Sequence, residues 1–200
     1  LLLAIDASDA PEYSKLVRKY RVLLRDGRPD DAAVALAAAV EAGPDVPEVI
    51  DAAFAAALSA GDYERAESLA ADAARLDIDD ASGLTFEARI KSEQGKADEA
   101  LELFTEAAEG APTNPVLWRL VGVQHVRMGQ DAQAITALRR TLDIQAQQPA
   151  VIVQYLAALI RTGETERALA EANRLQIFGQ RDQAFTEMYL TLQAQVGGDE

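Results

Sequence analysis

Glycine recurs through this sequence at one fixed interval. Six glycines lie 34 residues apart: Gly27, Gly61, Gly95, Gly129, Gly163 and Gly197. The first five are each followed, five residues later, by an alanine: Ala32, Ala66, Ala100, Ala134 and Ala168. Because the 200 residues contain only 12 glycines, this spacing indicates an internal repeat. A period of this length predicts a stack of similar units, each of which buries its apolar face against its neighbours.

Each period is typical of two helices joined by a tight turn. The helix expected after Gly95 has one apolar stripe at helical spacing, formed by Ala100, Leu101, Phe104, Ala107 and Ala108. The turn glycine is expected to end the first helix in the left-handed conformation, which glycine adopts without strain. Residues 183–196 are expected to form a further helix.

The expected helix ends carry matching signals. Acidic residues open each second helix and complement its positive N-terminus: Asp30, Asp31, Glu64, Asp98, Glu99, Asp131, Glu164 and Glu166. Prolines fall where first helices should begin, a position that tolerates them: Pro47, Pro115 and Pro149. The in-phase alanine after each turn is expected to let the two helices of a pair approach closely.

These residues carry a family resemblance. Two consecutive periods contain Ala100, Phe104, Ala107 and Pro112, followed by Trp118, Val121, Gly122, His125, Ala134 and Leu138. This pattern resembles the tetratricopeptide repeat (TPR), and the chain looks like a bacterial TPR array. The resemblance implies an all-α fold, a right-handed superhelix of antiparallel helix hairpins. It also implies that Trp118 and His125, which stand in consensus aromatic positions, belong to the core.

The period sets the expected domain organisation, a single array. Residues 1–12 are expected to be the end of a preceding repeat or an N-terminal cap. Five repeats follow, over residues 13–46, 47–80, 81–114, 115–148 and 149–182. Residues 183–200 are then a capping helix or the first half of a sixth repeat.

Composition narrows the function. The formal net charge of −14 opposes binding to nucleic acid and to anionic lipid, and no apolar run approaches the roughly 20 residues of a membrane span. The absence of cysteine excludes disulfides and thiolate sites, and it fits the cytoplasm and the periplasm equally. The segment 77–80 is acidic but lacks the glycine and glutamate of a calcium-binding EF-hand loop. No phosphate-binding, nucleophile or zinc-protease motif is present, so we expect no enzyme activity, no cofactor and no metal.

The resemblance implies that first helices line a concave surface where partners bind. Over residues 13–26, 47–60, 81–94, 115–128 and 149–162 the sequence has ten Lys and Arg against five Asp and Glu, whereas the remainder has nine against 28. Seven arginines are the candidate partner-binding residues: Arg18, Arg21, Arg25, Arg89, Arg119, Arg127 and Arg161. Arranged in a line, their guanidinium groups would hold a carboxylate-bearing peptide. Alternatively they pair with acidic neighbours such as Asp51, Glu87 and Glu93, or simply solvate the helix face.

One TPR subgroup grips the terminal carboxylates of chaperones, and its clamp is not expected here, because the matching positions hold Val17, Arg21, Ala52, Ser82 and Phe86. The sequence therefore predicts a non-catalytic scaffold that binds a protein or peptide, with an acidic segment as the candidate ligand. Three alternatives stay open: an accessory module of a larger enzyme, a component of cell-envelope or polysaccharide-export assembly, and self-association through the ends of the array.

Overall fold

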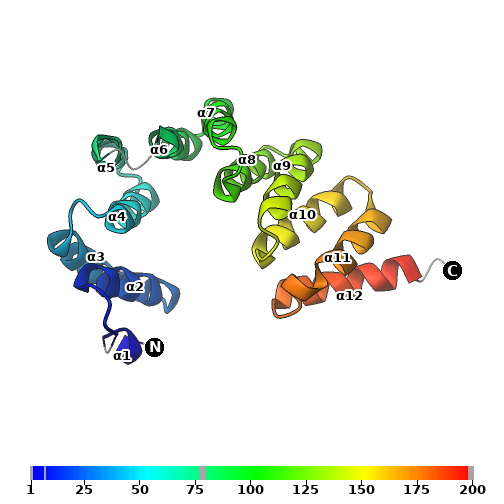
Figure 1. The fold of residues 1–200 in the computed structure, drawn as a ribbon, viewed down its shortest axis with the longest axis horizontal. Coiled ribbons are helices and arrows are strands. Elements are labelled where there is room, and N and C mark those ends of the chain that lie inside the picture. Colours follow the sequence, from blue (N-terminus) through cyan, green and yellow to red (C-terminus); the bar gives the residue numbers. More distant parts are fainter. Residues whose placement is uncertain (1, 7, 77–79, 198–200) are drawn as a thin grey trace. The chain divides into compact units, whose positions relative to one another are not determined.

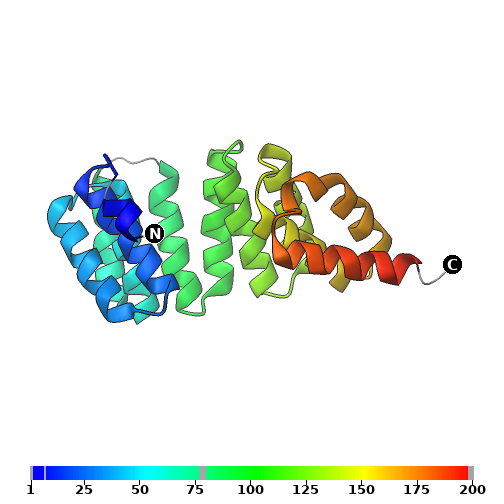
Figure 2. The ribbon, with the colours of Figure 1, turned by 90° about the horizontal axis from the view of Figure 1, so that it is seen from below.

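The computed structural model describes residues 2–6, 8–76 and 80–197, and every regular element in these ranges is an α-helix. Within each of the two units described below, the paired helices run antiparallel (Figure 1, Figure 2). The expectation of an all-α solenoid of helix hairpins is confirmed. The helices are α1 (Leu2–Asp6), α2 (Glu12–Arg25), α3 (Pro29–Ala42), α4 (Pro47–Ala60), α5 (Tyr63–Arg75), α6 (Asp80–Glu93), α7 (Ala97–Gly110), α8 (Pro115–Arg127), α9 (Asp131–Ile144), α10 (Pro149–Arg161), α11 (Thr165–Gly179) and α12 (Gln183–Gly197).

The turns inside the hairpins have one shared conformation. The five glycines from Gly27 to Gly163 all have φ between 71° and 80°, in the left-handed region, as expected. The alanine five residues after each of them is fully buried, so no larger side chain separates the paired helices. Pro47, Pro115 and Pro149 are the first residues of α4, α8 and α10.

The chain forms two compact units, residues 1–93 and residues 94–200. Unit 1 contains α1 to α6, and unit 2 contains α7 to α12. The boundary follows the last residue of α6, so the expected repeat at residues 81–114 contributes one helix to each unit.

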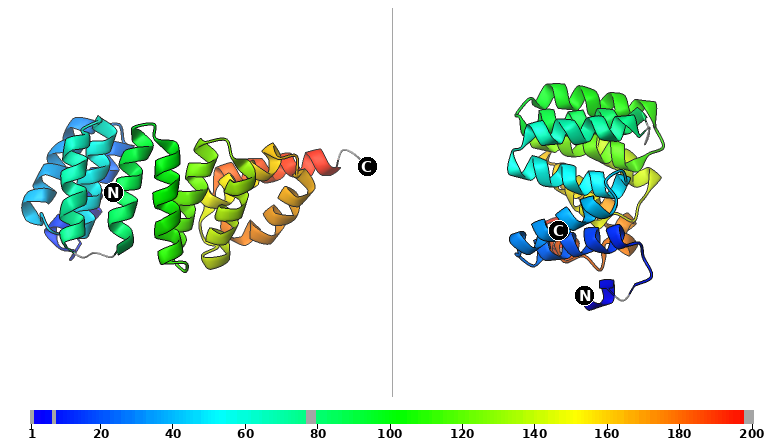
Figure 3. Two further views of the ribbon diagram at one scale, coloured as in Figure 1. Left: turned by 90° about the horizontal axis from the view of Figure 1, so that it is seen from above. Right: turned by 90° about the vertical axis from the view of Figure 1, so that its left-hand side faces the viewer.

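In unit 1, helix α4 contributes side chains to two neighbouring core clusters. One cluster joins α2 and α3 to α4 through Val17, Leu23 and Val49, and a second joins α4 to α5 and α6 through Phe54. The Phe54 ring meets that of Phe86 edge-on, with 4.4 Å between their centroids. Helix α4 therefore contacts α3 on one side and α5 on the other (Figure 3).

The core of unit 2 is continuous from α9 to α12. It contains large, fully buried side chains, among them Tyr155, Leu159 and Phe185. Two glycines permit close approach here: a Cβ atom on Gly122 would lie 2.6 Å from Cδ2 of Leu138, and one on Gly179 would lie 2.5 Å from Cγ of Phe185. Helix packing in this unit thus depends on glycine as well as alanine.

Candidate functional site

The seven candidate arginines divide between the two units. Unit 1 holds Arg18, Arg21 and Arg25 on α2, and Arg89 on α6; unit 2 holds Arg119 and Arg127 on α8, and Arg161 on α10. A line of guanidinium groups along the whole array stays a prediction.

Two of the arginines are held by carboxylates of their own unit. Nη1 of Arg89 lies 3.1 Å from Oδ1 of Asp51, and its guanidinium carbon lies 4.6 Å from the centroid of the Phe54 ring. This is the pairing with Asp51 that the sequence offered as the alternative reading. The cation is held by an ion pair and a cation–π contact together.

In unit 2, Arg161 is held by Asp131 through two contacts. Its Nη2 donates to Oδ1 of Asp131 over 2.6 Å, and its Nε lies 2.9 Å from Oδ2. The hydrogen bond from Arg161 lowers the pKa of Asp131 from its ordinary value, and the same bond raises the pKa of Arg161. This pair joins the end of α10 to the start of α9, so Arg161 serves the packing of the unit.

The arginines of α2 are held far more loosely. Arg21 reaches Glu48 over 3.6 Å, Arg25 reaches the adjacent Asp26 over 3.7 Å, and both side chains are more than half exposed. Arg18 is exposed and makes no ion pair with any residue in the described ranges. Lys15 and Lys19 lie on the same helix, half-buried. These five side chains, Lys15, Arg18, Lys19, Arg21 and Arg25, form what we call the α2 basic surface.

The two remaining arginines lie on α8. Arg119 is half-buried and has no ion-pair partner within the part of the chain that the structure describes, and Arg127 is exposed in the last turn. Sequence reasoning missed Asp131 as the partner of Arg161. The only sequence signal for Asp131 is its position in the first turn of α9, because the start of this helix lies next to the end of α10.

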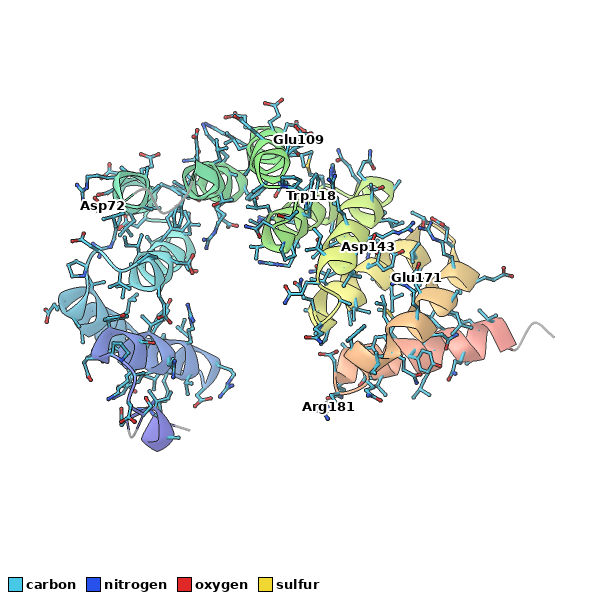
Figure 4. The ribbon with its side chains drawn as sticks, in the orientation of Figure 1. Asp72, Glu109, Trp118, Asp143, Glu171 and Arg181 are labelled. Atoms are coloured by element: carbon cyan, nitrogen blue, oxygen red, sulfur yellow. The ribbon has the colours of Figure 1, made fainter. Side chains whose placement is uncertain are left out.

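Trp118 and His125, the residues at the two consensus aromatic positions, differ in burial. Trp118 is buried as expected: its indole N–H donates to the carbonyl oxygen of Pro112 over 3.0 Å, and the Arg140 guanidinium lies 3.8 Å from the ring centroid (Figure 4). His125 is only half-buried, so its placement in the core was wrong. Its Nδ1 lies 2.7 Å from the side-chain oxygen of Gln130 in the turn, which holds the imidazole at the surface.

The described residues offer no site for a metal ion and no membrane-spanning helix. No group of three or more His, Asp or Glu side chains there could hold a metal ion, and the acidic segment 77–80 lies largely outside those ranges. Three of the positions that match the chaperone clamp, Val17, Ala52 and Phe86, are buried apolar side chains. No helix among the described residues has both the length and the apolar character needed to cross a membrane.

The comparisons with known proteins agree on one family. The tetratricopeptide-repeat family model matches residues 92–151, which begin in α6 and end in α10. No curated protein matches the sequence.

Solved structures share the fold at low sequence identity. A thermophilic TPR protein of Thermus thermophilus has a TM-score of 0.68 and 17% identity, covering 90% of this chain and 98% of its own. The first TPR of Spaghetti, solved bound to the HSP90 peptide SRMEEVD, has a TM-score of 0.52 and 20% identity, covering 58% of this chain and 93% of its own. YrrB, a TPR protein with an unusual peptide-binding site, has a TM-score of 0.54 and 11% identity, covering 86% and 89%.

At these identities the likeness shows the fold alone. Residues 92–151 thus match the tetratricopeptide-repeat family model, and the described helices share the helical-solenoid fold of these TPR proteins.

Proposed function

We propose that this chain is a non-catalytic scaffold whose α2 basic surface binds an acidic segment of a partner polypeptide. Two of the proteins that share its fold are peptide binders by description, and the peptide held by Spaghetti contains two adjacent glutamates. The proposal assigns no catalytic step and no cofactor to the chain. It leaves the identity of the partner to be found by experiment.

The observation that carries the proposal is the contrast between loosely and tightly held arginines. An exposed ion pair in the range of 3.6 to 3.7 Å contributes little to stability, so a partner carboxylate can replace Glu48 or Asp26 at small cost. Releasing Arg161 from Asp131 would instead break a two-point, charge-assisted contact. The available cations are therefore those of α2, while Arg89 and Arg161 keep structural roles.

Charge density supports the same surface. Helix α2 has five Lys and Arg and one Glu, in a chain whose formal net charge is −14. Guanidinium groups bind carboxylates with two parallel hydrogen bonds, and Arg18, Arg21 and Arg25 present three of them on one helix. We propose Arg119 and Arg127 as further contacts, made by unit 2.

The test is affinity capture from a native lysate with the whole protein as bait. The double variant Arg18→Glu/Arg25→Glu reverses two loosely held cations, and Arg75→Glu on α5 is the control with the same kind of charge change in the same unit. We expect a specific set of proteins to be captured by the wild type and the control but lost with the double variant. Circular dichroism should show equal helicity for all three.

The acidic nature of the ligand has its own readout. Overlapping peptides from each captured protein are tested for binding, and the bound segment should be rich in Asp and Glu. Capture that is unchanged by the double variant, or a bound segment without excess acidic residues, would overturn the proposal.

A further inference from the structure

Unit 1 contains an open apolar groove, and none of the cations of α2 lines it. It has a volume of about 750 Å³ and is lined by residues of α2, α3, α4 and α5. Tyr20 and Leu24 of α2 and Leu36 and Val40 of α3 form its larger apolar walls. A volume in this range is typical of ligand-binding clefts, which span roughly 300–1,000 Å³. We call this feature the unit-1 groove.

The groove exists because small residues stand where unit 2 has large ones. Ala33, Ala53 and Ala57 line the groove. Three periods further along the chain, the same positions hold Ile135, Tyr155 and Leu159, which are 6%, 0% and 0% exposed. The large side chains fill the corresponding space in the core of unit 2, whereas in unit 1 the space is left open to solvent.

An exposed apolar side chain marks the edge of the groove. Leu24 is 47% exposed although it lines the groove, so a ligand seated there would remove apolar surface from water. Exposed Ala33 and Ala37 on α3 and Ala60 on α4 add further small apolar surface, and their short side chains let a ligand backbone approach closely. The groove therefore offers an apolar seat with little steric obstruction.

The charges around the groove specify the kind of occupant. Residues 26–76, which supply every lining residue except Tyr20 and Leu24 of α2, contain eleven Asp and Glu against three Arg. Two of these arginines are paired locally, Arg28 with Asp31 and Arg75 with Asp72. Glu41 and Asp62 lie in the lining itself, with Arg65. An apolar seat with an acidic surround complements a segment that carries apolar residues flanked by Lys and Arg.

We propose that the unit-1 groove docks a basic amphipathic helix of a partner protein, with its apolar side chains seated between α3 and α5. This surface goes beyond the proposed function, because it takes a ligand of the opposite charge and uses none of the cations of α2. A second copy of this chain is a poor occupant, since its net charge of −14 would meet an acidic surround. Amphipathic helices seat in apolar grooves through residues at i, i+3, i+4 and i+7.

The probe is a fluorescein-labelled synthetic helix of about 16 residues, or roughly four turns, with leucine at those positions and lysine on the opposite face. Two matched peptides replace either lysine by glutamate or leucine by serine. Fluorescence anisotropy against the whole protein should show saturable binding of the leucine–lysine peptide alone. If that peptide fails to bind up to about 0.1 mM, or if either matched peptide binds equally well, the proposal is overturned.

Protein variants locate the binding. Ala33→Ile/Ala57→Leu fills the groove with the residues of unit 2 and should weaken binding of the probe by about tenfold or more. The control Ala71→Leu adds apolar volume on the exposed face of α5, which does not line the groove, and should leave binding unchanged. Equal binding by the filled variant and the control would place the probe elsewhere and refute the assignment.

A second pair of variants needs no repacking. Ala37→Lys places a cation on an exposed position inside the groove, whereas Val34→Lys places one on the same helix at a position 71% exposed and outside the lining. The first should weaken binding of the leucine–lysine probe several-fold more than the second.

Light scattering tests the alternative that the groove is a contact between two copies of the chain. A wild-type dimer that Ala37→Lys converts to a monomer would establish this alternative and overturn the proposal. The α2 variant Arg18→Glu/Arg25→Glu should still bind the probe, so failure of one proposal is distinguishable from failure of the other.

Discussion

The substitution of Gly122 by alanine tests the close packing of α8 against α9. A Cβ atom at this position would lie 2.6 Å from Cδ2, 2.7 Å from Cγ and 3.3 Å from the backbone nitrogen of Leu138, a residue with no exposed surface. The end of the Leu138 side chain could shift, but it is surrounded by packed atoms because the residue is fully buried. The backbone of α9 would also have to move. Overpacking of this kind costs about 1–3 kcal/mol.

The matched control is Gly83→Ala. Gly83 lies in α6, and a Cβ atom added there meets nothing within 4 Å. Alanine in a helix is favoured over glycine by up to about 1 kcal/mol. Since both variants gain from this preference, it largely cancels when they are compared. The difference in their free energies of unfolding should therefore equal the overpacking cost at Gly122, about 1–3 kcal/mol.

Urea denaturation followed by circular dichroism measures this difference. We expect a higher midpoint than wild type for Gly83→Ala and a lower one for Gly122→Ala. The double variant Gly122→Ala/Leu138→Ala should lose less than the sum of the two single losses, because truncation of Leu138 makes room for the new methyl group. A midpoint for Gly122→Ala as high as that of Gly83→Ala would refute the packing described for α8 and α9.

Three further predictions concern single side chains. Ala100 has no exposed surface, so Ala100→Arg should cost at least about 3 kcal/mol by thermal unfolding, whereas the same change at exposed Glu102 should cost far less. Tyr155 Oη is buried without a hydrogen-bond partner in the described ranges, so Tyr155→Phe should leave stability unchanged or raise it by up to about 1 kcal/mol. Arg161 lowers the pKa of Asp131 below its usual 3.8, so this carboxylate stabilises the fold above that pH and loses its effect as pH falls through the lowered pKa; Asp131→Asn should flatten that part of the acid unfolding curve.

The sequence could predict most of the helical framework because that framework depends on local chemistry. A left-handed turn favours glycine at Gly61 whatever lies around it, and a proline such as Pro115 suits the first turn of a helix. The fully buried alanines, Ala100 among them, were also predictable, because their position relative to the turn fixes which helix face they occupy. Period and turn chemistry together therefore define where each helix begins and ends.

The charged site depends on longer-range contacts, and the sequence predicted it less well. Arg89 and Asp51 are 38 residues apart, and Arg161 and Asp131 are 30 apart, so neither distance in sequence matches the 34-residue period. Which carboxylate an arginine reaches depends on how neighbouring hairpins are packed and on the rotamer of a long side chain. A consensus pattern contains neither kind of information. The seven candidate arginines therefore looked equivalent in the sequence, although Asp51 holds Arg89 and Asp131 holds Arg161.

The unit-1 groove corresponds to small residues at positions where later repeats have large ones, and the repeat pattern alone does not reveal this difference. The period aligns Ala53 with Tyr155 and Ala57 with Leu159, and all four are compatible with a helix. Only the difference in volume between aligned positions indicates that one unit is filled and the other is open. The difference in side-chain volume between equivalent positions of the repeats is therefore the sequence signal of the groove.

Helix α2 contributes to both proposed surfaces, and this has a consequence for how unit 1 would select a partner. Its residues Tyr20 and Leu24 line the groove, while Arg18, Arg21 and Arg25 carry the opposite chemistry. A partner with an acidic stretch joined by a short linker to a basic amphipathic helix would engage both, and the second contact would form at a high effective concentration. Binding through the α2 basic surface depends on charge and should weaken steeply with salt, whereas seating in the groove also buries apolar area and should weaken less. Capture of a partner that needs both surfaces should therefore survive moderate salt in the wild type, but not after the groove has been filled.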